Sequence, residues 1–369
     1  MIQINIKGFL MLNIFFTADY EMYFGKNYYT DTEILFEPTE KLVETFNKYN
    51  LKVNIFADIL SVAAHRKYNL SNYADNFELQ IKSFVKEGHD VQLHLHPHWL
   101  TAKYENNSWI FNKNHFRIHS FKNINEIVKN SIDYLNKTLN TVNPDYKCIA
   151  YRAGGWSLQP EGNLLKILYE NGIKIDSSIF KGGYKNIQTH YFDFRKIPDN
   201  VNYFIDPQKG INIESKNGIF EIPIASIYNF PARLFYKLLF KIYKNKIYKN
   251  KIILKKGESI IESNCKSSKF STVKARVKSF LIDPIFFSFD NTSSAEMIKF
   301  VDYLIAKYNT SEDDIYISII GHPKGLSDEQ LHEIDVFLEV VSTLYKDKVN
   351  FLTFQRFNRL NSDKLKGFC

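Results

Sequence analysis

The feature of this 369-residue chain that most constrains its fold is a repeated alternation of short apolar runs with stretches of helical periodicity. The apolar runs are rich in Ile, Val and Phe, as buried strands are, and occupy 12–17, 52–57, 91–95, 148–152, 173–176, 219–224, 315–320 and 349–353. Helical spacing lies between most of them, at 40–48, 76–86, 124–139, 161–170, 295–307 and 328–345. Strand and helix in alternation predict parallel strands joined by right-handed crossovers. We therefore expect an α/β fold, a closed or nearly closed barrel first and an open doubly wound sheet second.

The alternation stops for more than sixty residues between Ala225 and Asp290. We interpret this stretch as an insertion, at about 226–290, in a single barrel domain that spans 1–369, a length that suits one α/β barrel with insertions. The formal net charge of +8 is local, because 233–256 contains nine basic residues and no acidic one. The remaining chain is close to neutral and shows no nucleic-acid-binding motif, so we expect no nucleic-acid partner.

The basic segment has the pattern of an amphipathic helix that begins near Pro231. Its apolar positions recur at helical spacing with lysines between them: Leu234, Phe235, Leu238, Leu239 and Ile242, with Lys237, Lys241 and Lys244. One interpretation is peripheral contact of 231–256 with an anionic membrane surface. The alternative is a surface helix whose apolar side chains pack on the barrel.

The three cysteines, Cys148, Cys265 and Cys369, are odd in number and far apart. This spacing predicts neither a disulfide framework nor a cysteine metal site, so a reducing compartment is the default. No uninterrupted apolar run approaches the 18 or so residues that a membrane-spanning helix needs. We expect a cytoplasmic protein, with a peripheral position at the inner face of the membrane if the basic helix binds lipid.

Polar side chains gather where the predicted strands end. In parallel α/β folds the carboxyl ends of the strands form the active face, so residues there are candidates for chemistry. The segments concerned are Thr17 to Glu21, His94 to Trp99, Arg152 to Trp156, Asp176 to Ser178, and Gly321 to Pro323. We expect these five strand ends to converge on one mouth.

Four of the ten histidines lie between positions 89 and 98. On an extended strand His94 and His96 share a face, but Pro97 cannot continue a central ladder, so we expect a turn that brings His98 back beside His94. Neutral imidazoles with a nearby carboxylate suit Zn²⁺ or a similar divalent ion. The alternative is a group of solvated or core histidines near a surface turn.

The acidic residues at the end of the first strand are two positions apart, so Asp19 and Glu21 point to the same side. One would bind metal while the other handles protons, although a helix N-cap or turn role is the alternative. Arg152 would hold a carboxylate bidentately, or form a plain structural ion pair.

Two further strand ends carry candidates. Asp176 is a site element or an ordinary turn residue, and His322, between Gly321 and Pro323, is a natural general acid or a turn residue. Trp99 and Trp156 flank the motifs and would stack on sugar rings, with core packing as the alternative for Trp156.

The order of these motifs resembles the polysaccharide deacetylases, the NodB-homology group or carbohydrate esterase family four, from about Leu12 to Phe354. The similar segments are Gly88-His89-Asp90-Val91 ahead of His94 and His98, Tyr151 to Trp156, Asp176-Ser177-Ser178, and His322-Pro323. The first motif departs from the family, where two acidic residues are adjacent, because Tyr20 separates Asp19 from Glu21. The third lacks the usual Pro-Pro-Tyr, which leaves a backbone N–H near Gly155 or Trp156 as the oxyanion donor.

This resemblance implies a distorted barrel of about seven strands and a divalent metal, Zn²⁺ first with Co²⁺, Ni²⁺ or Mn²⁺ as alternatives. It also implies hydrolysis of N-acetyl or O-acetyl groups on sugars. Carried over by residue, the metal ligands are His94, His98 and, as third ligand, Glu21 with Asp19 as its rival. Asp19 is the base, Arg152 its partner and His322 the acid.

Three functions remain open from the sequence. The first is a metal-dependent deacetylase that acts on an N-acetylated glycan of a bacterial surface polysaccharide or its lipid-linked precursor. The second is a cyclic amide or ureide hydrolase of the same superfamily. The third is a non-catalytic carbohydrate-binding relative, an alternative that the altered first motif keeps open.

Overall fold

The computed structural model describes residues 11–247, 256–259, 283–311, 313–363 and 365, with backbone only for 239–247. Its centre is a curled, mostly parallel sheet with the strand order β12-β11-β13-β8-β7-β4-β3-β1-β17, and β18 pairs with β1 beside this path. The strands are β1 (Leu12–Tyr20), β3 (Asn54–Asp58), β4 (Asp90–Leu95), β7 (Ala150–Ala153), β8 (Ile175–Asp176), β11 (Phe204–Asp206), β12 (Gly210–Ser215), β13 (Ile219–Glu221), β17 (Ile315–Gly321) and β18 (Val349–Phe351). All eight predicted strands are present.

The two sides of the sheet meet just beyond β13. Residue Ser318 of β17 accepts a hydrogen bond from the Ala225 N–H and donates one to the Pro223 carbonyl, and Ile224 forms an isolated parallel bridge with Ser318. The sheet therefore curls into a distorted barrel, which confirms the predicted fold class.

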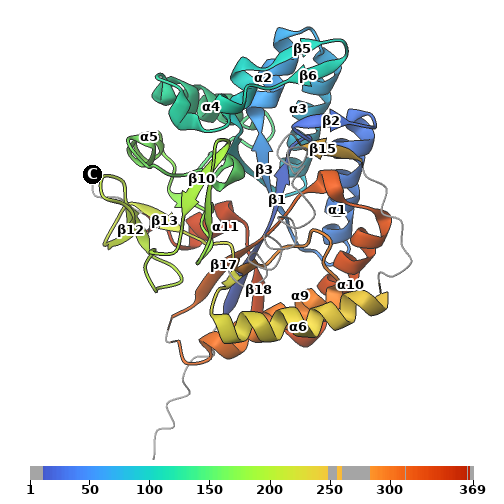
Figure 1. Ribbon diagram of the computed structural model, residues 1–369, viewed down its shortest axis with the longest axis vertical. Helices are drawn as coiled ribbons and strands as arrows, with labels where there is room; N and C mark the ends of the chain where they lie inside the picture. Colours follow the sequence, from blue (N-terminus) through green and yellow to red (C-terminus); the bar gives the residue numbers. More distant parts are fainter. Residues whose placement is uncertain (1–10, 248–255, 260–282, 312, 364, 366–369) are drawn as a thin grey trace, which may run out of the picture.

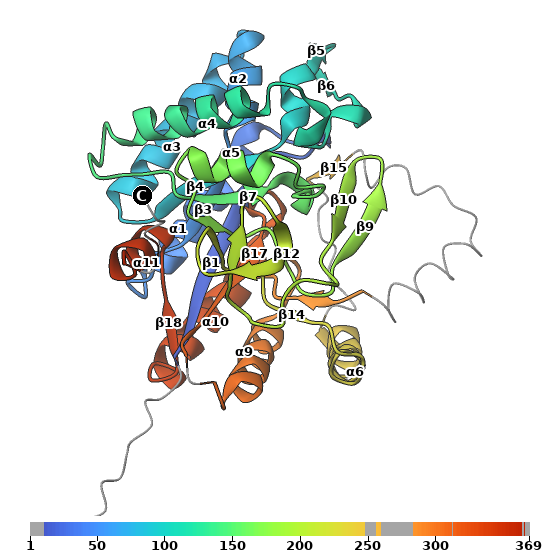
Figure 2. The same cartoon turned by 90° about the vertical axis from the view of Figure 1, so that its left-hand side faces the viewer.

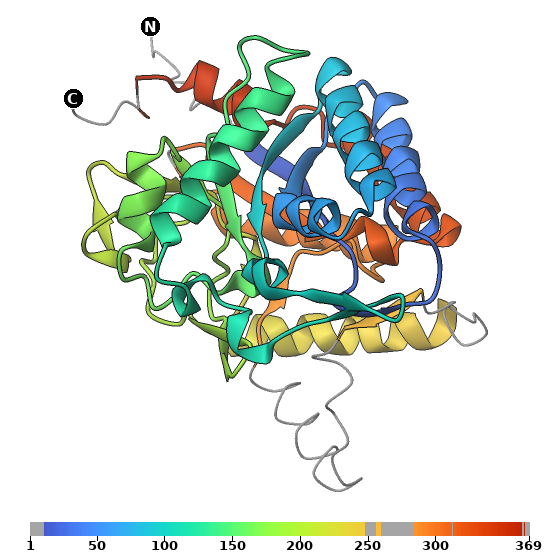
Figure 3. The same ribbon diagram turned by 90° about the horizontal axis from the view of Figure 1, so that it is seen from above.

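Helices cover the outside of the sheet, as Figures 1 and 3 show. They are α1 (Glu37–Asn47), α2 (Ile59–Lys67), α3 (Ser71–Lys86), α4 (Ile124–Leu139), α5 (Leu164–Glu170), α6 (Phe230–Ile247), α9 (Ser294–Tyr308), α10 (Asp328–Leu344) and α11 (Phe354–Leu360). Each predicted helix appears within a few residues of its expected bounds except α3, which begins earlier, at Ser71. The sequence pattern did not indicate α2 or α11.

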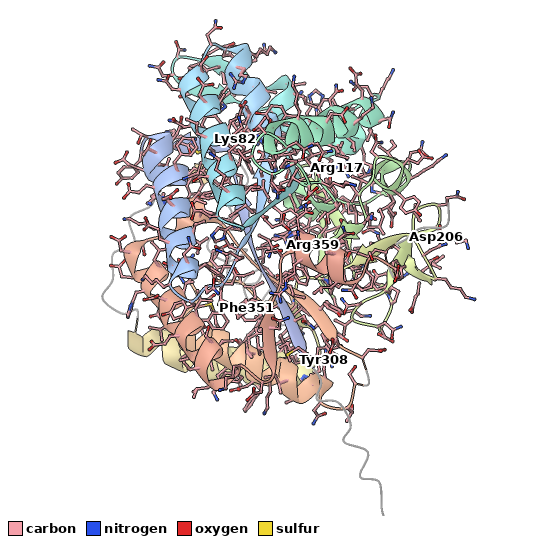
Figure 4. All side chains as sticks on the ribbon, turned by 180° about the vertical axis from the view of Figure 1, so that it is seen from behind. Lys82, Arg117, Asp206, Tyr308, Phe351 and Arg359 are labelled. Atoms are coloured by element: carbon pink, nitrogen blue, oxygen red, sulfur yellow. The ribbon has the colours of Figure 1, made fainter. Side chains whose placement is uncertain are left out.

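Side chains fill the inside of the barrel in layers, because alternate residues of a strand face the same side. At the base, Phe354 and Phe357 of α11 close the barrel, with ring centroids 4.8 Å and 5.8 Å from that of Phe15. Figure 4 shows this side of the molecule, with Phe351 of β18 and Arg359 of α11 labelled. Above Phe15, the inward positions of β1 become polar at Thr17 and Asp19, so the apolar base supports a polar upper layer.

The region interpreted as an insertion contains its own small elements: β14 (Ser226–Ile227), α6, β15 (Gly257–Ser259) and β16 (Ile285–Phe286). Strand β15 pairs with β2 (Gly25–Asn27), directly after the acidic motif, and β16 pairs with β14. A separate hairpin of β9 (Tyr184–Ile187) and β10 (His190–Asp193) lies on the same side of the sheet as β15 (Figure 2). The insertion and this hairpin thus add walls around the strand ends.

Candidate metal centre and active site

Arg152 organises the polar layer inside the barrel. Its guanidinium is fully buried and donates to Asp19 Oδ1 at 2.6 Å, to Thr17 Oγ1 at 2.8 Å, and to the carbonyl and hydroxyl of Ser177 at 2.7 and 3.0 Å. The ring of Phe56 lies 4.2 Å from its Cζ. A charge removed from water needs such partners to remain tolerable. Arg152 therefore engages one oxygen of the Asp19 side chain in an ion pair.

A possible metal-ligand group lies directly above this layer. One ligand atom from each of Glu21, His94 and His96 lies within 4.8 Å of the others, and all three residues are buried. Glu21 Oε2 is 3.0 Å from His94 Nε2 and 2.5 Å from His96 Nε2. Two imidazoles and a glutamate are the donor set of several catalytic zinc sites.

The surroundings of the two imidazoles also fit a metal site. His94 Nδ1 donates to the Arg152 carbonyl at 2.9 Å, which directs Nε2 toward Glu21, where a metal ion would displace the Nε2 proton. Buried Asp58 accepts from the backbone N–H of His96 at 3.2 Å and from Trp99 Nε1 at 2.7 Å, and so holds the chain that carries His96. Hydrogen bonds that orient ligands in this way are typical of metal centres.

Electrostatics couple these groups closely. Burial opposes the charge on His94, but Asp19 and Glu21 outweigh burial and raise its pKa to about 9. Burial lowers the pKa of His96 to about 4 despite the nearby Glu21. Burial opposes the charge on Glu21 as well, yet Lys324 and the two histidines hold its pKa well below the usual range. The carboxylate is thus kept ionised, as a ligand must be.

His98 lies elsewhere, which corrects the prediction that it joins His94. The chain stays extended through His96 and turns only at Pro97, so His94 and His96 keep the same face of the strand. His98 is buried among aromatic rings, 4.3 Å from Phe116 and 4.5 Å from Phe24 between centroids, and belongs to no ligand group among the described residues. Both of its ring nitrogens lack a hydrogen-bond partner there.

His322 directly follows β17 and lies beside both Asp19 and Glu21. Its Nε2 is 3.9 Å from Asp19 Oδ2 and 3.7 Å from Glu21 Oε1. Asp290 accepts from both the backbone N–H and Nδ1 of His322, at 2.8 and 2.7 Å. Burial opposes the charge on His322, but the Asp290 carboxylate prevails and raises its pKa. A protonated imidazole in this position is suited to act as a general acid.

Two residues of this site, Asp290 and Lys324, were not predicted from the sequence. Asp290 lay within the stretch interpreted as an insertion, where Asp before Asn-Thr-Ser is typical of a turn or cap. Lys324, two residues after His322, places Nζ 2.5 Å from Glu21 Oε1. The pairing with Glu21 could have been suspected only from the short spacing of Lys324 after the His-Pro motif.

The structure places Asp176 behind the site. Asp176 accepts from the backbone N–H and hydroxyl of Ser178, whose hydroxyl accepts from the Ala153 N–H. Asp176 does not line the cavity at the strand ends. Its predicted catalytic role therefore becomes a supporting one, since it holds the segment that carries Arg152 and its partner Ser177.

The ligand group and Asp19 open into one cavity of about 430 Å³, the size of a small-molecule site. Asp19, Glu21, His94, His96, His322 and Lys324 line it, together with Trp156. Trp156 has a left-handed backbone, φ +55°, which is strained for a bulky residue and is typical of functional positions. Trp99 does not line the cavity, because it is buried against Trp109 and Phe111.

Searches with the sequence matched no protein-family model and no curated protein. Solved structures that the chain matches include polysaccharide deacetylases, the family that the motifs resemble. A putative one from Mycobacterium smegmatis is 12% identical, with TM-score 0.46 over 98% of this chain and 93% of that one. A family 4 carbohydrate esterase from Streptomyces lividans is 8% identical, with TM-score 0.38 over 93% and 92%.

A 4-alpha-glucanotransferase and a branching enzyme match as well. A GH57-type branching enzyme from Pyrococcus horikoshii is 10% identical, with TM-score 0.47 over 97% of this chain and 71% of that one. The chemistry of the site rests on the residues of this chain.

Proposed function

We propose that this protein is a metal-dependent deacetylase that hydrolyses N-acetyl groups on a sugar of a surface polysaccharide or its lipid-linked precursor. The observation that carries the proposal is the position of Asp19 Oδ2, 3.9 Å from both His94 Nε2 of the ligand group and His322 Nε2. A base, an acid and a donor set for a divalent metal thus share one cavity.

Glu21, His94 and His96 would hold the metal, Zn²⁺ by donor chemistry, with Co²⁺, Ni²⁺ or Mn²⁺ as alternatives. A bound divalent ion would lower the pKa of a bound water and polarise a carbonyl group.

The side chains of this protein supply the proton transfers. Asp19, held by Arg152, takes a proton from the attacking water as the water oxygen bonds to the acetyl carbon. His322, held by Asp290, gives a proton to the sugar nitrogen as the carbon–nitrogen bond breaks. The products are acetate and a free amino sugar. A backbone N–H near Gly155 or Trp156 would donate to the developing oxyanion.

Acetate release tests this function directly. We expect the zinc-loaded protein to release acetate from N-acetylated oligosaccharides. Hydrolysis of cyclic amides or ureides without acetate release would favour the second superfamily activity. Sugar binding without any hydrolysis would favour a binding module.

We also propose a cytoplasmic location, with peripheral contact of α6 with anionic lipid at the inner face of the membrane. Helix α6 lies along one edge of the molecule beside α9 (Figure 1), and its Tyr236 packs on Phe300 of α9. Phe235 and Leu238 are 67% and 50% exposed on the other side. Exposed aromatic and aliphatic side chains next to lysines are typical of interfacial helices. Among the described residues, no helix is long and apolar enough to span a bilayer.

Flotation with liposomes tests this contact. We expect binding to vesicles that contain anionic lipid and loss of binding in the double variant Phe235→Ser, Leu238→Ser. Leu344→Ser, which removes a leucine of α10 that is 77% exposed, is the control. Equal flotation of the two variants, or no flotation of the wild type at low salt, would reject the contact.

A further inference from the structure

The charges that line the cavity are paired with one exception. Asp19 pairs with Arg152 at 2.6 Å, Glu21 with Lys324 at 2.5 Å, and Asp290 with His322 at 2.7 Å. Lys185 lines the same cavity and makes no hydrogen bond or ion pair with any described residue. The wall therefore presents an ammonium group that has no direct hydrogen-bond or ion-pair partner among the described residues.

The β9–β10 hairpin directs this lysine inward. Lys185 of β9 stands directly opposite Phe192 of β10, and opposed residues of an antiparallel pair share a face. Phe192 is buried and packs edge-on against Trp156, with centroids 6.0 Å apart. The neighbours of Lys185, Tyr184 and Asn186, are exposed. Lys185 is thus on the side of the hairpin that faces Trp156 and the cavity.

The surroundings of Lys185 are partly apolar. Burial lowers its pKa, although the charge of Asp283 opposes that change. His190 of the same hairpin also lines the cavity, and burial together with Lys185 lowers the pKa of His190 to about 3, so this imidazole is neutral. Gly155 allows the close approach of His190, since a Cβ there would lie 2.1 Å from His190 Nε2. A cation that is partly withdrawn from water gains most from an anionic partner.

We propose that Lys185 binds an anionic substituent, a carboxylate or a phosphate, of the sugar that enters this cavity. The substrate class is then an acidic N-acetylated sugar, with its ring against Trp156 and its charged group at Lys185. This inference rests on the proposed function for the acetyl group, but the recognition of the anion is a separate property of the wall.

Calorimetric titration with three sugars tests the inference. The ligands are N-acetylglucosamine, its uronic acid, and its 6-phosphate, which separate neutral, carboxylate and phosphate forms. We expect the wild type to bind at least one acidic sugar at least about tenfold more tightly than the neutral one, as a charged hydrogen bond would give. Lys185→Gln should remove this preference, and Lys185→Arg should keep most of it.

Lys196→Gln is the matched control, because it removes the same charge from an exposed position just beyond β10. Equal binding of all three sugars by the wild type, no binding of either acidic sugar, or equal losses in Lys185→Gln and Lys196→Gln would each overturn the inference. Acetate release without anion preference would leave the deacetylase standing and remove the role of Lys185. Anion binding that depends on Lys185, without acetate release, would keep the role of Lys185 and reject the deacetylase.

Discussion

Two buried pairs of acidic residues lie inside the same barrel and differ in their partners. At the mouth, Asp19 and Glu21 each contact a cation and line the cavity. Behind it, Asp176 and Glu221 on the adjacent strands β8 and β13 face each other. The carboxyl oxygens of Glu221 have no other hydrogen-bond partner among the described residues. The first pair thus lies against positive charge, and the second is enclosed.

The difference shows that burial alone does not make a carboxylate catalytic. Burial, then the nearby Asp176, raise the pKa of Glu221 well above its ordinary value, which favours its protonated form beside Asp176. For Glu21, Lys324 and the two histidines instead lower the pKa well below its ordinary value. The arrangement of cations decides which pair can bind a metal or accept a proton.

The sharpest test of this comparison removes one charge from each pair. Asp19→Asn should reduce the rate of acetate release by about 10²–10⁴-fold, the usual contribution of a general base, with metal content unchanged. Asp176→Asn should have a much smaller effect, because it supports Ser178 and lies outside the cavity. Steady-state kinetics with matched protein and zinc concentrations measure both. Similar losses in the two variants would remove the distinction between the pairs.

A smaller effect is expected at the acid side of the mouth. Asp290→Asn removes the carboxylate that raises the pKa of His322, so His322 should lose its proton at lower pH. The alkaline limb of the kcat/KM profile should therefore move to lower pH, since a general acid acts only while protonated. An unchanged alkaline limb would show that His322 is not the group that titrates there.

The smallest effect on activity, but a clear one on stability, is expected for Glu221→Gln. A raised pKa means that the stability contributed by the protonated wild-type group is fully present below the unfolded pKa, 4.5, and is lost as pH rises above it. The glutamine amide keeps a donor toward Asp176 without this pH dependence. The free energy of unfolding should fall more steeply from pH 5 to 9 in the wild type than in the variant, as urea denaturation would show.

Glu214→Gln on the exposed strand β12 is the control for that measurement. Equal pH slopes for the wild type and Glu221→Gln would mean that Glu221 is ionised in the folded protein.

Much of the fold followed from the sequence, because buried parallel strands and amphipathic helices have distinct periodicities. The sequence also predicted that Asp19, Glu21, His94 and Arg152 lie close together. They follow or end β1, β4 and β7, and the carboxyl ends of these strands share one edge of the barrel. The choice between His96 and His98 depended on where the chain turns. The turn does begin at Pro97 as predicted, but it carries His98 among aromatic rings and leaves His96 on the face of the strand that His94 shares.

Residues supplied by irregular segments were harder to predict. Asp290 and Lys185 reach the cavity through the insertion and the β9–β10 hairpin, whose tertiary positions no local periodicity determines. Asp176 was placed correctly at the end of its strand, yet its side chain is used for support. Strand position identifies the layer of a residue, and only its partners identify its role.

The metal content of two matched variants tests the central claim most directly. His96→Phe and His98→Phe each replace an imidazole with an aromatic ring in aromatic surroundings, and circular dichroism would verify that both fold. We predict about one divalent ion per chain in the wild type and in His98→Phe, and loss of the ion in His96→Phe. Loss of metal in His98→Phe with retention in His96→Phe, or no metal in the wild type after addition of zinc, would contradict the proposed centre.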